Sequence, residues 1–202
     1  MRFVKPSVEL LWITPNALQT IEISGRVCYK SEDKITQDSA TTFVKMIKQR
    51  GHESVVEHAC ASFRIVCDRG VSHEIVRHRI ASYSQESTRY CNYSKDKFGN
   101  EISVIEPPIK TPQAYAAWSH SVHAAERDYQ AMISAGESPQ IARSVLPNCL
   151  KTEIVMTANF REWLHFIDLR TSSAAHPQMR EVALMIQAIL AKECPEIFEP
   201  NA

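Results

Sequence analysis

The sequence lacks the features that would place it outside the cell or in a membrane. It contains six cysteines but no CxxC pair. No run of eighteen apolar residues is present that could span a bilayer, and the first residues have no long apolar segment of the kind found in a signal peptide. We therefore expect a cytoplasmic protein with reduced, mostly buried thiols, rather than a secreted protein held together by disulfides.

The chain also lacks an excess of charge of either sign. Lys plus Arg and Asp plus Glu both number 23 in 202 residues. A protein that binds nucleic acid by bulk electrostatics usually carries a basic excess, so any strongly positive site here must be local. The hydrophobic fraction of 44% is ordinary for a globular protein, and the length predicts one domain, residues 1–202.

Hydrophobic patterning predicts a mixture of strands and helices. The expected strands are 8–14, 59–67 and 152–157, and the expected helices are 17–29, 36–50, 115–132, 140–145, 160–169 and 177–192. A further short helix is expected to follow Gly70 and to end near Arg79. Because strands and helices do not alternate regularly, we expect an α+β fold, a single compact domain with a mixed or antiparallel sheet flanked by helices.

The stretch from Arg77 to Arg89 is the most informative part of the chain. It reads RHRIASYSQESTR and holds three arginines and a histidine in thirteen residues, with one acid, Glu86. A guanidinium meets phosphate or carboxylate oxygens two at a time and stays charged at any working pH, so the stretch predicts an anion site. A plain alternative is a basic last turn that complements a helix dipole. The polar run from Ser82 to Thr88 has no Gly or Pro, which favours an ordered ligand-binding segment.

Two further groups of polar residues carry weaker signals. The segment HESVVEH at 52–58 holds two histidines six positions apart, whereas a zinc-protease helix needs them four apart. This spacing argues against a metal hydrolase, and we expect no metal and a loop that offers Ser54 to a ligand. Arg161 and His165 share one face of an expected helix. Arg170 ends that helix beside an apolar position, and a buried arginine needs an anionic or polar partner.

The order and spacing of these motifs resemble the flavin-dependent thymidylate synthases. The shared segments are HESVVEH at 52–58, RHR followed after seven residues by Ser at 77–87, ARSVLP at 142–147, TANFREWLHFIDLR at 157–170 and CPEIF at 194–198. The resemblance covers about residue 21 to the C-terminus. It implies an FAD-dependent conversion of dUMP to dTMP in a homotetramer. The one-carbon donor would be 5,10-methylenetetrahydrofolate, the reductant NADPH, and no cysteine nucleophile would be needed.

The resemblance also implies roles for individual residues. The residues that would contact FAD are Ser54, Arg77, His78, Arg79, Gln85, Asn159, Phe160, Arg161 and His165. Those that would contact dUMP are Glu74, Ile75, Val76, Arg77, Gln85, Glu86, Ser87, Thr88, Arg89, Arg143 and Arg170. Arg170 would also be the catalytic group, beside the uracil ring. The chain departs from the family at Glu74, where members commonly have Gln, and at Gln85, where an acid is usual.

An alternative hypothesis is a nucleic-acid-binding module. In it the arginine-rich segment 77–89 contacts the phosphates, and Tyr83, Tyr90 and Tyr93 stack on bases. The zero net charge and the single local cluster oppose this alternative. We therefore expect small-molecule partners, with neither nucleic acid nor a membrane among them.

Overall fold

The computed structural model describes residues 1–199 and divides them into two compact units. The first unit contains Met1–Ser7, Ile65–Arg77 and Ser84–Ile154. The second contains Val8–Arg64, His78–Tyr83 and the described residues from Val155 onwards. The expected single domain over 1–202 stays a prediction, and its last three residues lie outside the described part of the chain. The boundary passes through the RHR motif, between Arg77 and His78.

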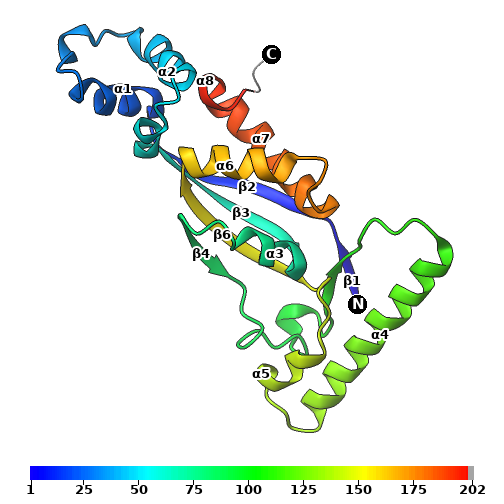
Figure 1. The fold of residues 1–202 in the computed structure, drawn as a ribbon. Coiled ribbons are helices and arrows are strands. Elements are labelled where there is room, and N and C mark those ends of the chain that lie inside the picture. The colour runs from blue at the N-terminus through cyan, green and yellow to red at the C-terminus, as the bar shows by residue number, and fades with distance from the viewer. Residues whose placement is uncertain (200–202) are drawn as a thin grey trace. The chain divides into compact units, whose positions relative to one another are not determined.

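A four-stranded sheet has the strand order β2-β3-β6-β4 (Figure 1). Its strands are β2 (Ser7–Ile13), β3 (Cys60–Asp68), β4 (Ala81–Gln85) and β6 (Lys151–Asn159). Backbone bonds join residues at opposite ends of neighbouring strands: Thr14 N to Cys60 O at 2.9 Å, Phe160 N to Ala59 O at 2.8 Å, and Glu86 N to Glu153 O at 2.8 Å. Each neighbouring pair is therefore antiparallel. Alternate residues of β6 are buried, as expected for a strand with one covered face.

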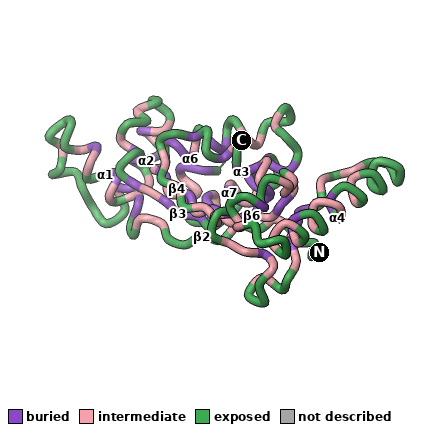
Figure 2. Tube along the Cα trace, turned by 90° about the horizontal axis from the view of Figure 1, so that it is seen from below, coloured by how far each residue is buried: buried purple, intermediate pink, exposed green. Residues whose placement is uncertain are grey.

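The first unit is built around a long helix and a short parallel ladder. Strand β1 (Arg2–Val4) pairs in parallel with β5 (Ser103–Ile105). Helix α4 (Pro112–Ser134) begins at Thr111, whose side chain accepts a bond from Ala114 N. Figure 2 shows most of α4 exposed, and the helix buries Val122 and Tyr129 in its unit's core. The other buried members of that core are Tyr93, Ile102, Val104, Ala142 and Leu150.

Short elements complete the first unit. Helix α3 (Arg69–Ile75) begins at Asp68, whose carboxylate accepts a bond from Val71 N at 2.7 Å. Helix α5 (Pro139–Ala142) continues into the 3-10 turn η4 (Arg143–Val145), and the turn η3 (Asp96–Phe98) precedes β5. The short turn η4 carries Arg143, one of the expected anion-binding residues.

The second unit packs helices against its part of the sheet. Its helices are α1 (Ala17–Val27), α2 (Ser39–Gln49), α6 (Phe160–Thr171), α7 (Pro177–Glu193) and α8 (Pro195–Phe198), with the 3-10 turns η1 (Glu32–Lys34) and η2 (Glu53–His58). Helix α6 packs on β3 through Trp163, whose indole N–H donates to Ala61 O at 3.1 Å. The Trp163 ring lies edge-on to the Phe63 ring, with 5.0 Å between the two ring centroids. These contacts fix Trp163, and with it the start of α6, relative to β3.

Most expected elements are confirmed, with differences around the arginine motif. Helix α3 ends at Ile75 instead of near Arg79, and strand β4 occupies the first part of the polar run that we expected to be an ordered segment. The three-residue strands β1 and β5 were not expected, because so short a run carries no clear periodicity. The α+β class is confirmed, with a mixture of parallel and antiparallel pairing.

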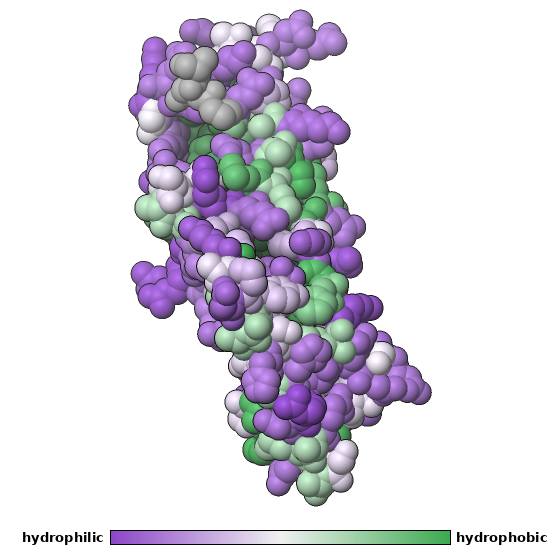
Figure 3. Space-filling model, turned by 90° about the vertical axis from the view of Figure 1, so that its right-hand side faces the viewer, coloured by the Kyte–Doolittle hydropathy of each residue, from purple (hydrophilic) through white to green (hydrophobic). Residues whose placement is uncertain are grey.

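The thiols are less buried than the sequence predicted, since only two of the six are buried and three are half-buried. All six cysteines are free; Cys67 and Cys194 are buried and Cys28 is exposed. None of the helices in residues 1–199 combines the length and apolar character needed to cross a membrane. Figure 3 shows apolar side chains interspersed with polar ones on the face that it draws. Trp12 and Tyr90 are two of the large apolar side chains that are exposed in the described part of the chain.

Candidate active site

The RHR motif connects α3 to β4 and does not cap a helix. The turn at the end of α3 is closed by Arg77 N, which donates to Glu74 O at 3.2 Å. Beyond it the chain has no regular secondary structure up to β4, and the burial of its side chains differs: Arg77 and Arg79 are exposed, whereas His78 is only 3% exposed. The hydroxyl of Tyr83 donates to the His78 carbonyl and holds this connection. The plain alternative, a basic last turn that complements a helix dipole, is therefore wrong.

His78 lies in a polar cluster with α6. Its Nδ1 is 2.9 Å from Glu162 Oε1, and its Nε2 is 3.2 Å from Arg170 Nε. Burial is the largest influence on His78 and lowers its pKa; the Glu162 bond opposes that shift and Arg170 supports it. His78 is therefore neutral at neutral pH, and the positive charge of the RHR motif comes from its two arginines.

The same cluster has the composition of a metal site. Ligand atoms of His78, Glu162 and His165 all lie within 4.8 Å of one another. However, both ring nitrogens of His78 already have hydrogen-bond partners, and one of those partners is the Arg170 guanidinium. A permanent positive charge at this distance opposes a cation. We therefore interpret the cluster as a hydrogen-bonded network.

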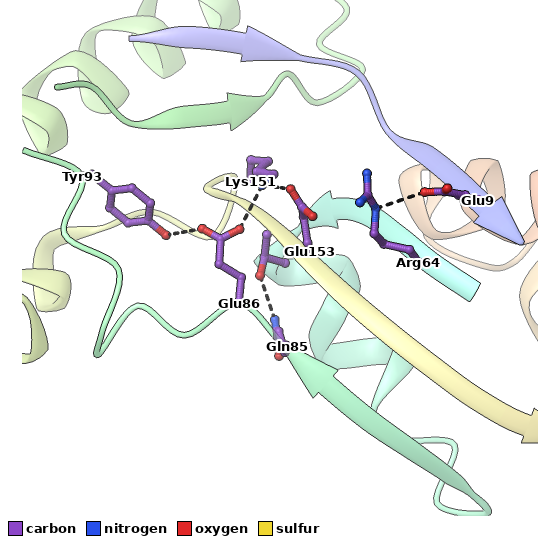
Figure 4. A network of polar contacts seen from close by, with 8 residues as sticks. Glu9, Arg64, Gln85, Glu86, Tyr93, Lys151 and Glu153 are labelled. Carbon is purple, nitrogen blue, oxygen red and sulfur yellow. Dashed lines mark hydrogen bonds and ion pairs between the residues drawn. The ribbon is translucent and has the colours of Figure 1, made fainter. Parts of the chain in front are cut away.

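The segment that follows β4, residues 86–89, is held by a second polar network in the first unit (Figure 4). We call it the anchored segment. Glu86 Oε1 accepts from the Tyr93 hydroxyl at 2.9 Å, and Glu86 Oε2 pairs with Lys151 Nζ at 2.9 Å. Lys151 also pairs with Glu153. Figure 4 shows Glu86 pointing between Tyr93 and Lys151. Both Glu86 oxygens have protein partners, so its side chain anchors the segment.

Gln85 is anchored in the same unit. Its amide nitrogen donates to Ser72 Oγ at 2.9 Å and to Thr152 Oγ1 at 3.2 Å. These bonds tie the end of β4 to α3 and to β6. An expected ligand contact of Gln85 would therefore use its amide oxygen or its main chain.

Two exposed arginines of the first unit are connected to this anchored segment. Arg143 Nη1 donates to Thr88 Oγ1 at 3.4 Å, and Arg89 Nε donates to Gln140 Oε1 at 3.1 Å. Gln140 belongs to α5, which leads directly into Arg143. The structure thus brings the expected dUMP residues Thr88, Arg89 and Arg143 into one group.

A cavity of about 430 Å³ lies in the second unit. Its lining residues are Gly25, Cys28, Tyr29, Ile47, Gly51, His52, Glu53, Ser54, Val55 and Arg161. The volume falls in the usual range for small-molecule pockets, about 300–1,000 Å³. Arg161 donates from Nε to Glu53 at 3.2 Å and from Nη1 to Glu57 at 2.6 Å. The cavity therefore brings together two expected flavin residues, Ser54 and Arg161.

Several expected ligand residues serve the fold through their side chains. Ile75 and Phe160 are fully buried, so a ligand could reach only their main chains. Asn159 accepts a bond from Glu162 N at 2.9 Å and caps α6. Tyr93 is 5% exposed, which removes it as a stacking platform in the nucleic-acid alternative.

Sequence reasoning missed Glu162, Lys151 and Gln140. A signal existed for Glu162, because Asn159 followed three residues later by Glu is the pattern of a capping box. The pattern correctly marks the start of α6, but the carboxylate bonds to His78 instead of to the helix end. Lys151 and Gln140 carry no local signal, since their partners lie 65 and 51 residues away.

Comparisons with known proteins agree with the resemblance. The family model described as "Thymidylate synthase complementing protein" matches residues 9–196. A flavin-dependent thymidylate synthase of Geobacter sulfurreducens is 34% identical over 95% of this chain and 84% of its own length. The corresponding protein of Pyrococcus abyssi is 33% identical over 92% of this chain and 79% of its own.

A solved structure supports the fold. A UMP/dUMP methylase, PolB from Streptomyces cacaoi, bound with 5-Br dUMP, superposes with a TM-score of 0.83 and covers 98% of this chain and 96% of its own. Its sequence identity of 22% supports likeness of fold alone. On the extent of the family match and the identity to its relatives, this chain belongs to the family of flavin-dependent thymidylate synthases.

Proposed function

We propose that the protein converts dUMP to dTMP, with bound FAD, NADPH as reductant and 5,10-methylenetetrahydrofolate as one-carbon donor. The single observation that carries the proposal, beside family membership, is the anchored segment with Arg89 and Arg143. A nucleotide phosphate carries close to two negative charges, and charge-assisted bonds from guanidinium groups are the usual means of holding it. The Ser87 hydroxyl and main-chain N–H groups of the segment add donors.

The residues of the second unit fit a flavin. The cavity beside Ser54 and Arg161 has the size and the mixed lining of a small-molecule site. We expect Arg161 and Ser54 to hold FAD, with the exposed Arg79 and His165 of the same unit as further contacts. Arg77 belongs to the first unit, and its contact with FAD stays an expectation from the family resemblance. When bound, FAD supplies hydride chemistry that no side chain possesses. The arginines would neutralise the charge of its phosphates.

Arg170 is the proposed catalytic residue. Electron density must move into the uracil ring before its C5 can act as a nucleophile, and a guanidinium beside the ring stabilises the negative charge that develops. For this role the guanidinium of Arg170 must point its N–H donors at the ring, so its orientation has to be fixed. The bond from Arg170 Nε to the His78 ring supplies that direction.

The proposed reaction uses no cysteine nucleophile, which agrees with the pKa shifts of the thiols. Burial raises the pKa of five of the six thiols, those of Cys60, Cys67, Cys91, Cys149 and Cys194. A raised pKa lowers the fraction of reactive thiolate. The remaining thiol, Cys28, lines the cavity on the flavin side.

The proposed assembly is a homotetramer, as the family resemblance implies, and the proposed location is the cytoplasm, as the cysteine usage led us to expect. The test of function is a dUMP-to-dTMP assay with FAD, NADPH and methylenetetrahydrofolate, in which each component is omitted in turn. We expect product only in the complete mixture, and a yellow protein whose flavin spectrum changes when dUMP is added. A protein that takes up no flavin on reconstitution, and binds random oligonucleotides in a salt-dependent way, would instead support the nucleic-acid alternative.

A further inference from the structure

The face of α6 that carries Arg170 also carries two partners of His78. Glu162, Phe166 and Arg170 follow one another at four-residue spacing and share one stripe of the helix. The His78 ring lies against the middle of the stripe, with its centroid 4.8 Å from that of Phe166. Its Nδ1 is 2.9 Å from Glu162 and its Nε2 is 3.2 Å from Arg170. One imidazole thus joins the two ends of the stripe.

The hydrogen bonds determine where the ring proton lies. A guanidinium has donors and no acceptor, so Arg170 Nε must donate to His78 Nε2. Nε2 therefore carries no proton, and the single ring proton is on Nδ1, where Glu162 Oε1 accepts it. If Glu162 were absent, this tautomer would lose its partner, and Nε2 could become the protonated nitrogen and no longer accept from Arg170.

We propose that Glu162 and His78 are positioning residues for Arg170. Glu162 sets the tautomer of His78, and His78 sets the direction of the Arg170 guanidinium. This inference rests on the proposed function, in which Arg170 acts on the uracil ring. A free arginine side chain has many rotamers to lose when it is ordered, and a bond at Nε, the guanidinium atom nearest the stem, orders it before substrate binds.

The arrangement is sensitive to acid. The groups that face His78 are Glu162, Arg170 and His165 of α6, while Tyr83 bonds to its carbonyl. Protonation of the ring would turn Nε2 into a donor that opposes the Arg170 N–H. Because burial lowers the pKa of His78, the Arg170 contact is kept at neutral pH. It is lost as the pH falls through the pKa of the folded protein, which lies below the ordinary value of about 6.5.

Substitutions separate positioning from flavin contact. We expect His78→Phe, which keeps the ring shape but removes the acceptor, to lower kcat/KM for dUMP by about 10- to 100-fold, with flavin content per chain unchanged. Glu162→Gln keeps an acceptor for Nδ1–H and should retain most activity, with the acid limb of the pH profile moved to lower pH. The control is Ser62→Ala, which removes a buried hydroxyl bond to Thr157 in the same unit and should leave kcat/KM unchanged.

A double-mutant cycle tests whether His78 acts through Arg170. In an Arg170→Ala background the added His78→Phe substitution should change the residual rate by less than about twofold, because the group that it positions is already gone. Equal and additive losses in the two backgrounds would overturn the inference. Loss of flavin from His78→Phe with an unchanged dUMP response would also overturn it.

The tautomer can be measured without turnover. Nitrogen-15 NMR of histidine-labelled full-length protein should show one neutral ring protonated at Nδ1, and that signal should disappear in His78→Phe. A His78 ring protonated at Nε2 would overturn the inference even in an active enzyme. If the wild-type protein makes no dTMP, the proposed function fails, and the NMR result still decides whether the Glu162–His78–Arg170 arrangement exists.

Discussion

Lys151 Nζ lies 2.9 Å from Glu86 Oε2, and only 18% and 14% of the two side chains are exposed. Tyr93 donates to the other oxygen of the same carboxylate. The pair thus connects the first residues of β6 to the segment that precedes Ser87 and Arg89. A mostly buried ion pair is costly to break from one side, since the remaining charge loses its counter-ion.

The first prediction concerns this pair. Lys151→Met should leave Glu86 buried and uncompensated, lower the free energy of unfolding by about 1–3 kcal/mol, and weaken dUMP binding because the segment is less ordered. Thermal unfolding and titration of the flavin spectrum with dUMP measure the two effects. Glu153→Gln removes the other acidic partner of Lys151 without touching Glu86 and should have the smaller effect on dUMP. Equal effects of the two variants would contradict the anchoring role.

The second prediction concerns Gly25 in α1. A Cβ at this position would lie 2.7 Å from Phe43 Cζ and 2.9 Å from Val55 Cγ1, which is closer than van der Waals contact allows. Gly25→Ala should therefore cost about 1–3 kcal/mol of stability, partly offset by about 1 kcal/mol of helix propensity. It should also reduce flavin retention, since both Gly25 and Val55 line the cavity. Ser24→Ala, one position earlier, is the control and should retain the flavin.

The third prediction concerns Arg161, whose ion pairs with Glu53 and Glu57 are exposed. Exposed ion pairs contribute little to stability, so Arg161→Ala should leave the Tm nearly unchanged but lower the flavin content of the purified protein. The matched control is Arg64→Ala. Arg64 is exposed to the same degree, 51% against 50%, and pairs with Glu9 at 3.3 Å, but it does not line the cavity. Equal flavin content in the two variants would remove Arg161 from the proposed flavin site.

The fourth prediction concerns thiol reactivity. Burial raises the pKa of Cys67 to about 12 and that of Cys194 to about 11, so at pH 8 both are almost entirely unreactive thiols. Exposed Cys28 should be alkylated first, and FAD should slow that reaction because Cys28 lines the cavity. Mass-spectrometric mapping of iodoacetamide adducts measures both effects. Cys28→Ser should retain dTMP formation, and a complete loss of activity would contradict the absence of a cysteine nucleophile.

The sequence by itself determined the α+β class, most of the helices and the sets of charged residues. Helix α4 illustrates why: Val122 and Tyr129 lie on one stripe at helical spacing, and periodicity of this kind is a local property of the chain. The motif around Arg77 was visible for the same reason, since charge is read from composition. The end of α3 was predicted wrongly, because pairing of β4 with β6 overrides the local helical pattern.

Only the tertiary structure decided which of these charged residues have protein partners. His78 and Arg79 are neighbours of similar polarity in the sequence, yet one is buried between Glu162 and Arg170 and the other is exposed. From the sequence alone Glu86 is a candidate ligand-binding acid, but in the structure Lys151 and Tyr93 bond to its two carboxylate oxygens. Partners separated by 65 to 92 residues leave no periodic trace in one sequence. Their pairing depends on the burial of both groups in one place, which exists only after the chain has folded.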